Sequence, residues 1–223
     1  MSVGMATAAL MAGSASGAAV AAPAPAEQEA QASLYVSIDV LVRTSVFPAE
    51  SCCHWVARHS HEGFRNDTVD RCETGDRLLP GRYGVQTRQF IYRSKPPDRF
   101  LLASARSTVV KFTGPHAAKL YYRHYVRDGF DCRPRHVDGG TPGGGTAVYK
   151  VVRKAAGHTV IADEVTESGA TTMRRYIDTR RVGHFVTIVE YDLGEEIAYR
   201  PDLHRVDHIA DAQQRRLERR MNI

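Results

Sequence analysis

The stretch that decides the fold is residues 146–191, TAVYKVVRKAAGHTVIADEVTESGATTMRRYIDTRRVGHFVTIVEY. Its β-branched and aromatic residues divide it into four segments that we predict to be strands, Thr146–Lys154, His158–Thr166, Ala170–Thr179 and Val182–Tyr191. Few residues separate them, namely Ala155–Gly157, Glu167–Gly169 and Arg180–Arg181. Connections of this length join neighbouring antiparallel strands. The stretch therefore predicts an antiparallel meander.

The segment before this stretch predicts a hairpin followed by a helix. Tyr83–Tyr92 and Phe100–Phe112 have the composition of strands, and the prolines of Lys95–Asp98 between them cannot continue a ladder. Pro115 then suits the first turn of a helix, where its missing N–H group costs nothing. We expect the helix to end at Gly129 and to cover the sheet with an apolar stripe of Ala117, Leu120, Tyr121, His124 and Tyr125.

The remaining segments predict a closing helix, an N-terminal strand and two loops. Asp202–Met221 has apolar residues along one side, which predicts an amphipathic helix. Ser33–Arg43 alternates like a half-buried strand, with a helical turn as the alternative. Phe47–Pro80 is rich in His, Arg and Asp, so we predict an irregular segment that cross-links stabilise. Gly139–Gly145 predicts a flexible connector, because the Gly-Lys-Ser/Thr of a phosphate-binding loop does not follow.

Residues 1–32 carry no Lys or Arg and consist largely of Ala, Gly and Ser. An apolar centre and small-residue cleavage candidates at Ala19–Ala21 and Ala24–Ala26 are typical of a secretory signal peptide, although the usual basic start is missing. The alternative is a disordered Ala-rich arm. A membrane span is not expected, because Pro23 and Pro25 interrupt the run. We therefore predict a leader over 1–32 and a single secreted domain over 33–223.

The four cysteines, Cys52, Cys53, Cys72 and Cys132, are expected to form two disulfides in an oxidising compartment. A bridge between Cys52 and Cys53 closes an eight-membered ring, so this pairing is the least favoured. Cys72 with Cys132 is preferred, because it ties the irregular segment to the end of the first predicted helix. That choice leaves Cys52 and Cys53 without separate partners, so bridges from each of them to Cys72 and Cys132 stay open.

The chain has a formal net charge of +5, and its densest basic cluster lies in the closing helix at Arg215, Arg216, Arg219 and Arg220. Acidic residues share that helix, and the other basic residues are scattered, which indicates a solvated surface rather than a nucleic-acid site. We therefore expect no nucleic-acid partner. The rival interpretation is a cytosolic basic protein whose tail contacts nucleic acid.

Residues with catalytic or metal-binding chemistry do not form a recognisable motif. His54, His59 and His61 lie near Cys52 and Cys53 in the sequence, and imidazole and thiolate are ligands for zinc. Adjacent cysteines are not a metal clamp, and disulfide formation competes for them, so we predict no metal site and no cofactor. The sequence also lacks a Gly-x-Ser-x-Gly elbow, and we assign no catalytic residue. A secreted hydrolase or metal-dependent enzyme that uses the three histidines is the alternative function.

Tyrosines are the candidates for a binding groove. Tyr121 and Tyr125 on the predicted helix, with Tyr149 and Tyr176 on predicted strands, each combine an apolar ring with a polar tip. Such residues are typical of ligand pockets. We therefore predict these four tyrosines as ligand-binding residues in a cleft between helix and sheet.

The order of the predicted elements, together with a few motifs, resembles a known family. The elements are the strand over Phe100–Phe112, the helix that leads to Cys132, the late segment RVGHFVTIV at Arg181–Val189, and the Arg-rich closing helix. Over Tyr83–Met221 the chain is similar to the PknH-like extracellular sensor domains of bacteria. The resemblance implies an antiparallel sheet whose helices form a cleft, a helix-terminal cysteine in a disulfide, and a binding rather than catalytic role. The adjacent Cys52 and Cys53 depart from the family pattern.

Together these features predict an α+β fold, in which helices pack on one face of an antiparallel β-sheet to form a cleft and disulfides stabilise the domain. The function they favour is that of a secreted, non-catalytic, sensor-like binding domain. Its expected partner is a small molecule, a cell-envelope component or another protein.

Overall fold

The computed structural model describes residues 34–48, 51–65, 68–69, 77–78, 83–96, 101–124, 135–137, 145–167, 170–193 and 203–223. The predicted leader, residues 1–32, lies outside these ranges. The helices are the 3-10 turns η1 (Ile38–Val40) and η2 (Thr44–Val46) and the α-helices α2 (Pro115–Arg123) and α3 (Leu203–Met221). The strands are β1 (Cys53–Arg65), β2 (Thr68–Val69), β3 (Arg77–Leu78), β4 (Tyr83–Ser94), β5 (Leu101–Lys111), β6 (Arg135–Val137), β7 (Gly145–Ala155), β8 (His158–Glu167), β9 (Ala170–Val182) and β10 (Phe185–Leu193).

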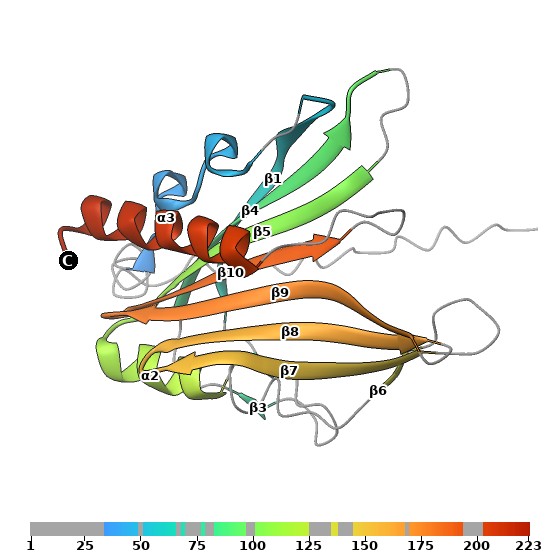
Figure 1. The fold of residues 1–223 in the computed structure, drawn as a ribbon. Helices are drawn as coiled ribbons and strands as arrows, with labels where there is room; N and C mark the ends of the chain where they lie inside the picture. Colours follow the sequence, from blue (N-terminus) through green and yellow to red (C-terminus); the bar gives the residue numbers. More distant parts are fainter. Residues whose placement is uncertain are drawn as a thin grey trace, which may run out of the picture.

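The main feature of the fold is an eight-stranded sheet with the order β1-β4-β5-β10-β9-β8-β7-β6 (Figure 1). All neighbouring strands in it are antiparallel. The predicted hairpin is β4 with β5, and the predicted meander runs from β7 to β10. These two units join where β5 pairs with β10, for example at Val110 opposite Val186. The α+β fold with an antiparallel sheet is thus confirmed.

Glycine fixes the position of the last hairpin turn. Val182 pairs with Phe185 across the two residues Gly183-His184. Gly183 has a φ of +58°, a conformation that other residues rarely adopt. The predicted connection at Arg180–Arg181 is therefore wrong. Both arginines belong to β9, because the turn needs the positive φ that Gly183 supplies two residues later.

The region around the first cysteines differs from the prediction, because it contains a long strand. β1 pairs with β4, with Trp55 opposite Tyr92. Burial alternates along the start of β1. The side chains of Cys53 and Trp55 are buried, and those of His54 and Val56 are exposed. The predicted irregular segment over Phe47–Pro80 is wrong for this part, since an edge strand needs only one apolar face and tolerates polar residues on the other.

The N-terminal segment is also different. The predicted strand over Ser33–Arg43 is wrong, and the helical alternative holds at η1. Val42 donates its backbone N–H group to Gln213 Oε1 of α3 at 2.9 Å, instead of to a neighbouring strand. The apolar residues Val40 and Leu41 are buried in a cluster that also contains Leu217 of α3. The segment therefore packs against the C-terminal helix, beside which Figure 1 shows both short helices.

α3 packs on one face of the sheet. Its apolar stripe joins a buried cluster that includes Val160, Tyr176, Val189, Tyr191, Val206, Ile209 and Ala210. The predicted amphipathic closing helix is confirmed by this packing. In the part of the chain that the structure describes, no helix is both long and apolar enough to span a membrane.

α2 packs on the opposite face. Its Ala118 is fully buried in a second cluster with Ile161, Ile177, Val186 and Ile188. Successive side chains of a strand point to opposite faces, and Ile161 and Ile177 directly follow Val160 and Tyr176 of the first cluster. The prediction that the helices share one face is therefore wrong. The central strands are apolar on both faces, so each face requires its own cover.

α2 is described over fewer residues than the helix predicted for this region. α2 begins at Pro115, as predicted, with Gly114 as its N-cap. It is assigned up to Arg123, and residues 125–134, which contain the predicted end at Gly129, lie outside the described ranges. The predicted connector over Gly139–Gly145 lies almost entirely outside them as well.

Candidate functional site

A group of charged side chains lies between the sheet and α3. His158 begins β8, Asp178 and Arg180 lie on β9, and Asp207 and Asp211 lie on α3. The strands pair with His158 opposite Arg180. Because Asp178 and Arg180 are two residues apart on one strand, both side chains point to the face that α3 covers. The sheet register and the helix packing therefore bring the five residues together.

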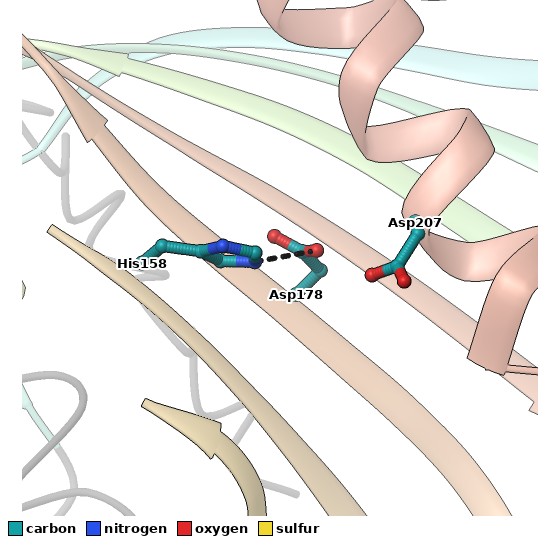
Figure 2. A group of neighbouring side chains, drawn as sticks. All are labelled: His158, Asp178 and Asp207. Atoms are coloured by element: carbon teal, nitrogen blue, oxygen red, sulfur yellow. Dashed lines mark hydrogen bonds and ion pairs between the residues drawn. The ribbon is translucent and has the colours of Figure 1, made fainter. Parts of the chain in front are cut away.

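Asp178 is at the centre of this group, and its side chain has no exposed surface. Arg180 Nε and Nη2 donate to the two Asp178 carboxylate oxygens at 3.0 and 3.1 Å. His158 Nε2 lies 3.0 Å from Asp178 Oδ2 (Figure 2). Arg180 Nη1 also donates to Asp211 Oδ1 of α3 at 2.5 Å. A bidentate guanidinium–carboxylate pair of this kind is a strong, charge-assisted contact.

Three of these residues also have the chemistry of metal ligands. The ligand atoms of His158, Asp178 and Asp207 lie within 4.8 Å of one another. Both carboxylates already have cationic partners, because Arg180 contacts Asp178 and Arg153 Nη1 lies 2.6 Å from Asp207 Oδ1. A divalent cation would therefore lie close to two guanidinium groups that repel it. We interpret the group as an ion-pair network that fixes α3 to the sheet.

A pocket of about 270 Å³ opens between η2 and the first turns of α3. Its lining residues are Ser45, Val46, Phe47, Pro48, His204, Arg205 and His208. His204 and His208 are one helical turn apart, so they lie on the same side of α3. The pocket thus combines an apolar wall from the η2 segment with two imidazoles and one guanidinium from the helix.

The apolar wall of the pocket is held by aromatic packing. The Phe47 ring lies 4.6 Å from the Trp55 ring and 4.5 Å from the Phe90 ring, measured between centroids. Trp55 Nε1 donates to the Pro48 carbonyl oxygen at 2.9 Å. Because Phe47 and Pro48 both line the pocket, Trp55 of β1 supports the wall from behind.

A disulfide joins Cys52 to Cys53, with the two Cα atoms 3.7 Å apart. The prediction that this pairing is the least favoured, because of its small ring, is wrong. Cys53 is buried on the face of Trp55, while Cys52 lies in the exposed turn before β1. Cys72 and Cys132 lie outside the described residues, so their bridge stays a prediction.

The predicted tyrosines lie on different faces of the sheet. Tyr121 and Tyr149 pack against the cluster beneath α2. Tyr176 belongs to the cluster beneath α3. Tyr125 lies outside the described residues. The structure therefore brings Tyr121 and Tyr149 to one face and Tyr176 to the other.

The predicted histidines lie along β1. An extended strand rises about 3.3 Å per residue, so the backbones of His54 and His61 are roughly 23 Å apart. This separation exceeds the reach of two imidazole side chains toward one metal ion. The side chains of His59 and His61 lie outside the described part, whereas that of His54 is exposed. A metal site shared by His54 and His61 is thus excluded by the strand geometry.

The face of the sheet opposite α3 carries a second group of charges. Arg175 Nε donates to Asp163 Oδ2 at 3.0 Å. Glu190 Oε2 lies 3.6 Å from Arg106 Nη1 and 3.8 Å from Arg175 Nη1, which is too far for strong hydrogen bonds. Burial therefore raises the pKa of Glu190 above its ordinary value, although Arg106 and Arg175 act to lower it.

Replacing Glu190 with glutamine is expected to change how stability depends on pH. A raised folded-state pKa means that the contribution of Glu190 to stability is complete below its unfolded-state pKa of about 4.3 and is lost as the pH rises through the folded-state value. The free energy of unfolding of the wild type minus that of E190Q should therefore fall as the pH rises from about 4. Urea unfolding across this pH range measures the difference. If this difference instead grew with pH, the two arginines would lower the pKa of Glu190 by more than burial raises it.

These features define an α+β domain, built on an antiparallel sheet that α-helices cover on both faces, with a pocket at the start of its last helix. Among solved structures, the chain is similar to the extracellular domain of PknH from Mycobacterium tuberculosis, with a TM-score of 0.49 and 10% sequence identity. The alignment covers 81% of this chain and 93% of that chain. No family model and no curated protein matches the sequence. A similarity of this size concerns the course of the chain alone.

Proposed function

We propose that this chain is a secreted, non-catalytic binding domain whose pocket between η2 and α3 takes a small anionic ligand with an apolar part. The observation that carries the proposal is the composition of the pocket lining. Val46, Phe47 and Pro48 supply apolar surface, and Arg205 faces them with a permanent positive charge. Pockets with an apolar wall and a few polar groups are typical of small-molecule sites.

The chemistry of the helix side selects the charge of the ligand. A guanidinium group donates to carboxylate or phosphate oxygens, and such charge-assisted bonds are stronger than neutral ones. His204 and His208 add ring nitrogens on the same side of α3. The volume of about 270 Å³ limits the ligand to a small molecule. An aromatic or short aliphatic carboxylate or phosphate ester fits both the charge and the size.

The proposed location rests on the sequence and on the disulfide. The Ala-rich residues 1–32 have the composition of a secretory leader. Disulfides persist in oxidising compartments, and the Cys52–Cys53 bridge is consistent with one. A second bridge between Cys72 and Cys132 belongs to the same proposal. The binding role of Tyr121, Tyr125, Tyr149 and Tyr176 stays a prediction.

Replacing Arg205 with glutamine is expected to weaken binding of an anionic aromatic probe by about tenfold or more, because a charge-assisted hydrogen bond contributes roughly 1.5–3 kcal/mol. Benzoate and phenyl phosphate are suitable probes, and titration calorimetry measures their affinity. Trp55 fluorescence gives a second signal, since its ring contacts the Phe47 wall.

The matched control is Arg219→Gln, which removes an exposed arginine from the last turn of the same helix. It changes the net charge by the same amount but lies far from the pocket along α3. Equal loss of affinity in both variants would show that binding follows overall charge. Failure of the wild type to bind either probe would overturn the proposed ligand class.

A further inference from the structure

The Cys52–Cys53 bridge differs from an ordinary structural disulfide. Most bridges join Cα atoms about 4.4–6.8 Å apart, whereas these two are neighbours in the sequence with Cα atoms 3.7 Å apart. Their ring contains only the atoms of the two residues. Deviation from the usual geometry makes a disulfide easier to reduce. The adjacency of the two cysteines alone imposes this deviation.

The bridge also has little of the usual stabilising role. A disulfide restricts the unfolded chain to an extent that grows with the number of residues in its loop. A loop of two neighbouring residues restricts almost nothing. The fold of β1 instead depends on its pairing with β4 and on the burial of Trp55. The bridge therefore does not link distant segments of the chain, and we look for a role other than stabilisation of the fold.

The two sulfur-bearing residues lie in different environments. Cys52 is exposed in the turn before β1, and Cys53 is only 4% exposed in the cluster that contains Phe47 and Trp55. The exposure of the two residues therefore favours attack by a solvent thiolate at Cys52 over attack at Cys53. The rate of thiol–disulfide exchange depends on which sulfur is attacked and on access to it.

We propose that Cys52–Cys53 is a thiol–disulfide exchange site that a dithiol reductant opens and an oxidised dithiol closes. One thiolate of the reductant attacks Cys52 Sγ, the Sγ–Sγ bond breaks, and Cys53 leaves as a thiolate that takes a proton from solvent. The second thiolate of the reductant then attacks the reductant's sulfur in the mixed disulfide. The bond between that sulfur and Cys52 Sγ breaks, and Cys52 leaves as a thiolate. Two electrons pass to the protein, and the reductant becomes a disulfide.

Opening of the ring changes the start of β1. The Cys52 carbonyl oxygen accepts a hydrogen bond from the Lys95 backbone N–H group at 2.9 Å, and the Ser51 carbonyl accepts from Lys95 Nζ at 2.6 Å. Without the ring, the backbone of Cys52 regains rotational freedom next to these bonds. Trp55, the single tryptophan of the chain, shares the buried cluster of Cys53. Its fluorescence therefore reports the state of the bridge.

The test treats the folded, full-length protein with dithiothreitol and follows alkylation by peptide mass mapping together with Trp55 fluorescence. We expect Cys52 and Cys53 to become alkylated under conditions in which the fold persists, with a change in fluorescence that reverses when an oxidised dithiol is added. Peptide mapping separates this reaction from any at Cys72 and Cys132. A bridge that resists reduction until the protein unfolds would overturn the proposal, as would native bridges from Cys52 or Cys53 to Cys72 or Cys132.

Two matched variants test which sulfur reacts. In Cys53→Ser the remaining Cys52 thiol should form a mixed disulfide with glutathione disulfide at least tenfold faster than the remaining Cys53 thiol does in Cys52→Ser. Equal rates would contradict an ordered attack at Cys52. Reduction of the wild-type protein needs neither substitution. It therefore still tests the proposal if one of the variants fails to fold.

Discussion

Replacing Asp178 with asparagine is expected to lower the free energy of unfolding by about 3 kcal/mol, because removal of one partner from a buried ion pair leaves the other charge uncompensated. The Asp178 side chain has no exposed surface, and that of Arg180 is only 10% exposed. Asp211 still contacts Arg180, which keeps the loss near the lower end of the usual range. Urea unfolding followed by circular dichroism measures the change.

The same network supplies a control. Asp207 forms an ion pair with Arg153. The Asp207 side chain is 21% exposed and the Arg153 side chain is 41% exposed. Replacing Asp207 with asparagine should therefore cost less than about 1 kcal/mol, as for other solvent-exposed pairs. Equal losses for the two variants would contradict the assignment of Asp178 as the buried centre of the network.

Replacing Gln213 with leucine is expected to cost roughly 2–4 kcal/mol, because buried polar groups lose their hydrogen-bond partners. Gln213 is fully buried. Its Oε1 accepts from the Val42 N–H group at 2.9 Å and from Ser107 Oγ at 2.6 Å. Its Nε2 donates to the Val40 carbonyl oxygen at 3.2 Å. Leucine has a suitable size for the site but supplies none of these contacts.

The neighbouring Arg215→Ala is the control for this prediction. Arg215 lies on the exposed side of the same helix, so its replacement should change the free energy of unfolding by no more than about 0.5 kcal/mol. Thermal or urea unfolding of both variants gives the comparison. A Gln213→Leu variant as stable as wild type would show that the N-terminal segment is held by apolar packing alone.

Periodic segments of the sequence predict most of the sheet and the last helix. The alternation in β8 and β10 and the stripe of α3 are local patterns, and their packing follows from them. β1 is missed because its polar residues conceal one apolar face, which carries Cys53 and Trp55. The N-terminal segment is misassigned because its partner, Gln213, lies 171 residues away from Val42 in the sequence. Local patterns carry no information on contacts at that separation.

The sites are less predictable than the fold. Asp178 lies on a predicted strand, but Arg180 falls in the predicted connection, so the sequence does not indicate that the two charges share one face; the packing of α3 also shows that this face is buried. The pocket joins η2 to His204, Arg205 and His208 across more than half of the chain. A general geometric preference makes the Cys52–Cys53 ring the least favoured pairing, yet the structure contains it. Each of these features depends on tertiary structure.

The hydrogen bonds between Gln213 and the N-terminal segment have a consequence for the order in which the chain folds. The backbone groups of Val40 and Val42 obtain a buried side-chain partner, Gln213, from α3. During synthesis, α3 is the last of these elements to leave the ribosome. The nascent chain therefore cannot complete this part of its core until α3 has been synthesised. Until α3 emerges, the apolar residues that this helix covers stay accessible to chaperones.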